Sequence, residues 1–221
     1  MTQLKLKNQV QIDLENIQHS FAELREVKDL FARRNWFPAT SGNLSVRVEV
    51  PDGEPPLIAV TASGKDKSVH TAEDFLLVDL EGKPVLPTRQ KPSAETLVHT
   101  TIYQKIKQCQ AIFHIHTVFN NLISELYGAQ QEVTFTNQEI IKAFNIWDEG
   151  AAVELPIVEN YAHIPTLAKE VGQVLDPRIP GVLIRNHGIY VWGDSVFAAK
   201  RHLEAFEFLF EYQVNLFLLK K

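Results

Sequence analysis

The chain has 221 residues, of which 45% are hydrophobic and 22% are charged, with a net charge of -5. This length fits one sizeable α/β domain better than two small ones, and the composition is that of an ordinary globular protein. The negative charge argues against nucleic-acid binding, because such proteins carry a basic surface. A small anionic substrate remains compatible with it, since backbone N–H groups can hold a phosphate locally.

The single cysteine, Cys109, excludes an intramolecular disulfide and a thiolate-rich zinc site, and it fits a reducing compartment. Residues 1–11 lack the apolar core of a signal peptide. No stretch approaches the roughly 20 apolar residues of a membrane span. The sequence therefore predicts a cytoplasmic protein with one domain over residues 1–221 that binds neither nucleic acid nor membrane.

Apolar periodicity and turn residues predict the elements of the first half of the chain. Helices are expected over residues 11–34 and, beginning at Pro92 or Ser93, over residues 92–108. Proline at position 38 ends the first helix. The expected strands span residues 43–50, 57–61, 75–80 and 111–117, with a hairpin turn at residues 51–53.

The second half of the chain shows the same signals. Helices are expected over residues 120–127, 137–144 and 165–175, and a long one begins after Asp194 or Ser195. The expected strands span residues 181–185 and 189–192. The last helix is more apolar than one buried face requires, which indicates a subunit interface.

Two histidines, His114 and His116, lie two residues apart in a predicted buried strand. Residues i and i+2 of a strand point to the same face, so both imidazoles project together. This pair suits a tetrahedral zinc ion, which takes three protein ligands in catalytic sites. By itself it is also compatible with two structural histidines in a polar cleft.

His187 is the candidate for the third ligand. It follows an apolar strand and precedes Gly188, which allows a sharp turn. Ligands of α/β domains gather at the carboxyl ends of strands, where His187 and His116 are both expected. His99, one helical turn after Glu95, is interpreted as an i,i+4 partner of that carboxylate rather than as a ligand.

Two segments combine hydroxyl side chains with a glycine, as a phosphate site requires. The first glycine loop is Thr-Ser-Gly-Asn at residues 40–43, and the second is Thr-Ala-Ser-Gly-Lys at residues 61–65. Lys65 and Lys67 would add positive charge. Residues of these types are also common in ordinary turns, so neither loop by itself is specific evidence for a phosphate site.

The order of five motifs, SGN, TxSG, PSAE, HxH and NHG, resembles the class II (zinc-dependent) aldolase family, also called the AraD or fuculose-phosphate aldolase family. The likeness runs from about Ala39 to Trp192. It implies a three-layer α/β/α domain with a central, largely antiparallel sheet. It also implies a homotetramer with active sites at subunit interfaces, and a small phosphorylated ketose as substrate.

The resemblance further implies roles for single residues. The zinc (Zn2+) ligands of the family correspond to His114, His116 and His187, and His163 is an alternative third ligand. Glu95, in PSAE, corresponds to the acid/base carboxylate of the aldolases. The expected phosphate-binding residues are Ser41, Gly42, Asn43, Ser63, Gly64 and Ser93.

Four segments resemble more closely a dehydratase subgroup of this family: residues 39–45, 64–67, 137–142 and 187–193. In that likeness the acid/base residue is Glu139, which on its own would be interpreted as a solvated first-turn glutamate. The acid/base assignment stays open between Glu139 and Glu95. Three alternatives stay open for the function. The chain could be a dehydratase, an aldolase or 4-epimerase, or a binding module without catalytic activity. The candidate contacts for an apolar part of the substrate are Phe119, Phe135 and Trp147.

Overall fold

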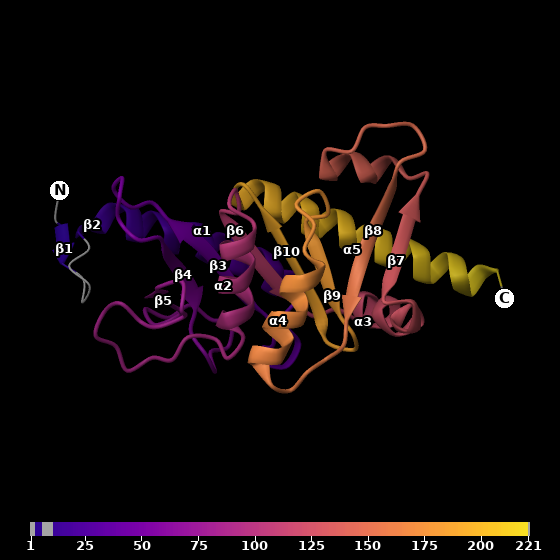
Figure 1. The fold of residues 1–221 in the computed structure, drawn as a ribbon. Helices are drawn as coiled ribbons and strands as arrows, with labels where there is room; N and C mark the ends of the chain where they lie inside the picture. Colours follow the sequence, from indigo (N-terminus) through magenta and orange to yellow (C-terminus); the bar gives the residue numbers. More distant parts are fainter. Residues whose placement is uncertain (1–2, 6–10, 221) are drawn as a thin grey trace.

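The computed structural model describes residues 3–5 and 11–220. Its centre is an eight-stranded sheet in the order β5-β4-β3-β6-β10-β9-β8-β7 (Figure 1). Neighbouring strands are antiparallel except for the parallel pair β8 and β9. The strands of this sheet are β3 (Asn43–Val48), β4 (Leu57–Thr61), β5 (Phe75–Val78), β6 (Ala111–Ile115), β7 (Glu132–Thr136), β8 (Ala152–Val158), β9 (Gly181–Ile184) and β10 (Gly188–Gly193). The predicted, largely antiparallel sheet is confirmed.

Helices cover both faces of the sheet, which gives the three layers that were expected. One face carries α1 (Leu14–Arg33), α3 (Val118–Leu126) and α5 (Val196–Leu219). The other carries α2 (Thr96–Lys105) and α4 (Ile164–Val174). Each core receives alternate residues of the strands, because successive side chains of a strand point to opposite faces. In β6, for example, Phe113 lies in the α1 and α5 core and Ile112 in the α2 core.

Some element boundaries differ from the prediction. The first helix begins at Leu14 because Asp13 caps it, and residues 11–13 form strand β2 (Gln11–Asp13), paired with β1 (Gln3–Lys5). The second helix begins at Thr96 rather than at Pro92 or Ser93. Those two residues instead contact the end of β4, where the backbone N–H of Ser93 donates to the Thr61 carbonyl at 3.1 Å.

Three short 3-10 helices complete the chain: η1 (Pro38–Thr40), η2 (Gly128–Gln130) and η3 (Glu139–Phe144). The last of these replaces the α-helix predicted over residues 137–144. Strands β7 and β8, which flank η3, were not predicted. Within the described part of the chain, no helix is long and apolar enough to cross a membrane.

The ends of β4, β6 and β9 and the starts of β3 and β10 lie at one end of the sheet. The register shows this, since Asn43 opposes His114 and Gly188 opposes Ile184. Segment η3 lies at the opposite end, because it precedes β8, which runs parallel to β9 (Figure 1). This separation decides which predicted site residues can meet within one chain.

Candidate active site

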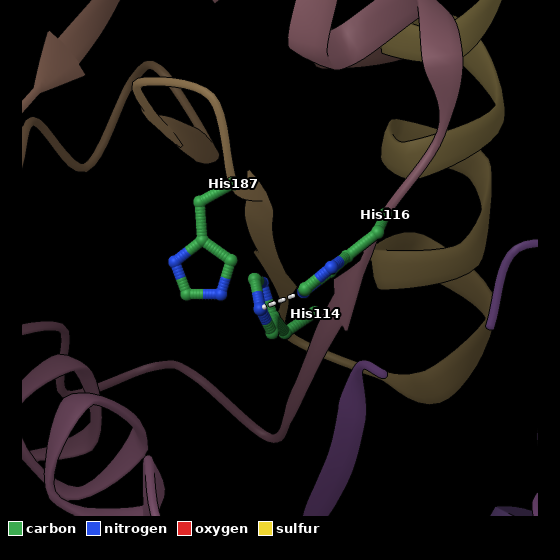
Figure 2. A group of neighbouring side chains, drawn as sticks. All are labelled: His114, His116 and His187. Atoms are coloured by element: carbon green, nitrogen blue, oxygen red, sulfur yellow. Dashed lines mark hydrogen bonds between the residues drawn. The ribbon is translucent and has the colours of Figure 1, made fainter. Parts of the chain in front are cut away.

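Three imidazoles converge at the first of these ends (Figure 2). His114 lies in β6, His116 follows that strand, and His187 lies in the turn between β9 and β10. One ligand nitrogen from each lies within 4.8 Å of the others. The Nε2 atoms of His114 and His116 are 2.8 Å apart. These three residues, the histidine triad, are therefore spaced to surround a single ion.

His114 and His116 have the chemical state that a metal ion requires. Desolvation of the fully buried His114 lowers its pKa to about 3. Desolvation, together with the neighbouring His114, lowers the pKa of His116 to about 2. Neutral imidazole is the form that binds metals. The Nδ1 atom of His114 lies 2.9 Å from the Ile189 carbonyl oxygen, and donation there leaves Nε2 free as a ligand. The donor set fits a bound metal ion.

Neighbouring groups hold the triad in place. The ring of Tyr190 stacks on that of His114, with centroids 3.9 Å apart. The side-chain amide of Asn121 donates to the His187 carbonyl at 3.1 Å. Gly188 is required by close packing, since a Cβ there would lie 2.4 Å from the Ile115 carbonyl oxygen. The glycine after His187 thus allows β10 to approach β6 closely.

Glu95 lies directly against the triad. Its Oε1 atom is 3.1 Å from His187 Nε2, and its Oε2 atom is 3.4 Å from His114 Nε2. Asn43 donates to the same carboxylate at 2.7 Å. Burial by itself raises the pKa of Glu95, but His114, His187 and the Asn43 hydrogen bond together hold it well below the usual range. An ionised carboxylate therefore faces the centre.

The predicted pairing of His99 with Glu95 is wrong. His99 is buried and bonds through Nε2 to the Asn43 side-chain oxygen, and its Nδ1 lies 2.6 Å from Ser45 Oγ. Desolvation lowers its pKa to about 4, so the ring is neutral. A hydrogen-bonded chain thus runs from Ser45 through His99 and Asn43 to Glu95. The signal for it was available, since Asn43 and Ser45 share one face of a predicted strand.

The residues predicted to bind phosphate come together beside Glu95. At Thr61, where β4 leads into the second glycine loop, the hydroxyl accepts from the backbone N–H of Leu44, next to the first loop, and the carbonyl accepts from that of Ser93. Gly42 and Gly64 have φ values of 73° and 70°, a region that favours glycine. The residues gathered here are Ser41, Gly42, Asn43, Ser63, Gly64 and Ser93. Their role as phosphate ligands stays a prediction.

Glu139 lies far from the triad in the same chain. It opens η3 at the opposite end of the sheet, where its side chain is 83% exposed and pairs with Lys142 at 2.7 Å. It lines a cavity there together with Phe208 and Tyr212 of α5. Of the two predicted acid/base residues, only Glu95 meets the triad within one chain.

Four further residues considered from the sequence lie away from the triad or within the core. His163 is an exposed residue that precedes α4 and bonds to Thr166 at 2.9 Å, and it is not part of the metal-binding group. Phe135 is buried in the α5 core, and Phe119 packs on the same core, as is usual for aromatic residues. Trp147 is 68% exposed on the η3 side of the molecule.

Comparison with known proteins agrees with this geometry. Residues 22–214 match the family described as "Class II Aldolase and Adducin N-terminal domain", and the chain belongs to that family. Methylthioribulose-1-phosphate dehydratase of Geobacillus sp. (strain WCH70) is 56% identical over 199 residues, covering 90% of this chain and 92% of that protein. The protein of the same name from Bacillus subtilis (strain 168) is 54% identical over 200 residues, covering 90% and 94%.

A solved structure supports the fold. L-fuculose-1-phosphate aldolase from Thermus thermophilus superposes with a TM-score of 0.71 at 21% identity, covering 92% of this chain and 97% of the aldolase. The predicted fold class and family resemblance are both confirmed.

Proposed function

We propose that this chain is a zinc-dependent dehydratase that converts 5-methylthioribulose 1-phosphate into 5-methylthio-2,3-dioxopentyl phosphate, a step of methionine salvage. The observation that carries the proposal is the ionised Glu95 facing the three imidazoles of the triad beside two glycine loops. The identity of 56% to a protein named for this reaction selects dehydration among the chemistries that the fold can host.

The site divides into two parts. The triad would hold Zn2+, which when bound supplies Lewis-acid polarisation of the substrate ketone. The glycine loops bind the phosphate on C1 through backbone N–H groups and the Ser41, Ser63 and Ser93 hydroxyls. In the described residues the Ser41 Oγ atom is buried without a hydrogen-bond partner, which suits an anion at this position.

The reaction needs one carboxylate that acts twice. The C2 ketone makes the C3 proton acidic, and the carboxylate removes it. The same group then gives a proton to the C4 hydroxyl, the C4–O bond breaks, and water leaves. The resulting enol loses the proton of its C3 hydroxyl and gains a proton at C4, which gives the 2,3-diketone.

We assign this acid/base role to Glu139, with Glu95 as the alternative. Since Glu139 lies at the opposite end of the sheet, it can act only on the site of another copy of the chain. A homotetramer with active sites at subunit interfaces is therefore part of the proposal. In this arrangement Glu95 accepts hydrogen bonds from Asn43 and His187 and keeps the latter oriented.

The test is incubation with 5-methylthioribulose 1-phosphate, followed by mass spectrometry of the product. Loss of one water and formation of the diketone are expected, and the purified, unchelated protein should contain zinc. Glu139→Gln should abolish dehydration with zinc still bound. A dead Glu95→Gln variant beside an active Glu139→Gln variant would reverse the roles. An aldehyde without diketone would indicate an aldolase, and a protein free of divalent metal would exclude both enzymes.

A further inference from the structure

A cavity of about 520 Å³ opens beside His116 and His187. We propose that it binds the methylthio end of the substrate, and that Val118 and Leu122 are the contacts that select this group. The inference rests on the proposed function, because it uses the substrate named there. It assigns a place to the part of that substrate that takes no part in bond breaking.

The position of the cavity fits the layout of the substrate. Two residues of the triad line it. Its described lining includes Pro38, which lies just before the first glycine loop, but no residue of either loop. In the substrate the phosphate is on C1, the ketone on C2 and the methylthio group on C5. A substrate with its phosphate at the loops and its ketone at the triad therefore extends its C5 end past the triad, where this cavity lies.

The chemistry of the wall fits a thioether. Val118 and Leu122 are four residues apart on α3, so they lie on the same face of the helix. They are 72% and 42% exposed, although both are large apolar side chains beside a polar centre. Pro38 adds a third apolar surface. A methylthio group is apolar and polarisable, and covering this wall with it removes apolar surface from water.

The charge of the cavity excludes the other end of the substrate. Glu125, at the rim, accepts hydrogen bonds from Asn186 at 2.7 Å and from Arg185 at 2.9 Å. These bonds lower its pKa, so it remains ionised. Arg185 is shared between Glu125 and Glu159 and offers no unpaired positive charge. A phosphate here would meet a carboxylate, which fixes the direction of binding.

The cavity is also preformed. The side chain of Asn121 joins α3 to the carbonyl of His187, and the Ser124 hydroxyl accepts from the backbone N–H of Asn186 at 2.9 Å. These two bonds tie the helix that carries the apolar wall to the turn that carries a triad histidine. Binding sites for small molecules are usually formed before the ligand arrives, as this one is.

The first test compares two substrates. For Leu122→Asn, kcat/KM with 5-methylthioribulose 1-phosphate should fall about tenfold, whereas kcat/KM with 5-deoxyribulose 1-phosphate, which lacks the methylthio group, should change less than about twofold. Leu126→Asn is the matched control, because Leu126 is on the same helix, is 41% exposed and lies outside the cavity lining. Equal losses with both substrates, or no loss with either, would overturn the assignment.

The second test does not need turnover. The reduced analogues 5-methylthioribitol 1-phosphate and 5-deoxyribitol 1-phosphate cannot be dehydrated, and calorimetry gives their Kd values. The wild-type protein should bind the methylthio compound about tenfold more tightly, and Leu122→Asn should lose that preference. A wild-type protein that shows the preference without dehydrating the substrate contradicts only the proposed function. One that dehydrates the substrate but shows no preference contradicts only the cavity assignment.

Discussion

The orientation of one carboxylate, that of Glu95, depends on residues outside the triad. Asn43 donates to Glu95 and accepts from His99, whose other nitrogen lies against the Ser45 hydroxyl. Because the ionised Glu95 can only accept, the Asn43 amide nitrogen faces it and the Asn43 oxygen faces His99. His99 therefore carries its proton on Nε2, and its Nδ1 accepts from the Ser45 hydroxyl. A buried histidine thus fixes the direction from which Glu95 faces the metal centre.

Removal of this histidine should affect the rate and leave the metal in place. In a His99→Leu variant the Asn43 amide is no longer held, and kcat should fall about 10- to 100-fold, as is usual for groups that orient metal-site residues. Zinc content, measured by atomic emission, should remain that of the wild type, since no triad residue is changed. Tyr103→Phe is the control, because Tyr103 contacts the far side of Ser45 at 3.0 Å. Loss of zinc in His99→Leu would contradict the role given to His99.

Single residues also show how far sequence reasoning reaches. The triad could be predicted, because strand periodicity places His114 and His116 on one face and a glycine after His187 signals a close turn. The role of His99 was missed, although the shared strand face of Asn43 and Ser45 carried a signal for it. Helical spacing favoured Glu95 as its partner, but tertiary packing of α2 on β3 offered Asn43 and Ser45 instead.

At the scale of elements, α5 supports α3 through a buried carboxyl group. Glu207 of α5 accepts hydrogen bonds from Thr117, the N-cap residue of α3, and from Asn120 in its first turn. Desolvation raises its pKa to about 7, although both hydrogen bonds act in the opposite direction. This glutamate is therefore half-protonated near neutral pH in the folded protein.

The contribution of Glu207 to the stability of the fold should therefore fall with rising pH, in the direction opposite to that of the buried neutral histidines His99, His114 and His116. The unfolded chain releases the Glu207 proton near pH 4.5 and the folded chain near pH 7, so the folded state holds more protons between these values. The contribution of Glu207 to the free energy of unfolding should decrease across this window by on the order of 3 kcal/mol and then stay level. Urea denaturation at pH 5 and pH 8 measures the change. The wild type should lose about 3 kcal/mol of stability relative to Glu207→Gln between these two pH values, whereas its difference from Glu26→Gln, in an exposed position on α1, should stay the same.

A second contact between elements ties α1 to the segment that follows the second glycine loop. Lys28 of α1 and Asp74 form an ion pair of 2.6 Å, with side chains 2% and 3% exposed. Lys28 also donates to the Val69 carbonyl at 2.6 Å. Asp74 accepts from the Thr71 hydroxyl and backbone N–H. The segment between the second glycine loop and β5 is thereby held against the helix.

Breaking this pair on one side should be costly. Lys28→Met leaves a buried carboxylate without its cation, and the free energy of unfolding should fall by about 3–5 kcal/mol. The double variant Lys28→Met, Asp74→Asn should recover part of the loss, because no charge is left unpaired. Lys65→Met is the matched control, since its 2.7 Å pair with Glu73 is exposed and should contribute less than about 1 kcal/mol. A double variant less stable than Lys28→Met would contradict this account.

Most elements with clear periodicity were predicted, but the strands β7 and β8 were missed although their side chains alternate between exposed and buried. The α5 and α1 helices and the strands β3, β4, β6, β9 and β10 carry strong apolar patterns. The strand β8 contains Pro156, which weakens the strand signal, and β7 is short and half exposed at the sheet edge. Their pairing depends on contact between segments that flank η3, which a local pattern does not encode.

At the scale of the whole molecule, the surface around η3 has the properties of a subunit contact. Phe208 and Tyr212 of α5 are 54% and 45% exposed and border the same cavity as Glu139 and Ile140. Trp147, nearby in sequence, is also exposed. A chain that presents apolar side chains beside a candidate acid/base residue, yet far from its own metal centre, is suited to supply that residue to a second copy.

Subunit complementation tests this arrangement. His114→Asn lacks a proposed metal ligand and Glu139→Gln lacks the proposed acid/base group, so each homo-oligomer should be inactive. When the two are co-expressed in equal amounts, a site is intact only if its triad comes from the Glu139→Gln chain and its glutamate from the His114→Asn chain. Random assembly makes about one quarter of the sites intact, so about a quarter of wild-type activity should return. Glu139 acting within its own chain would leave the mixture inactive, as would a monomeric enzyme, and mixed oligomers isolated with two different affinity tags ensure that a negative result is decisive.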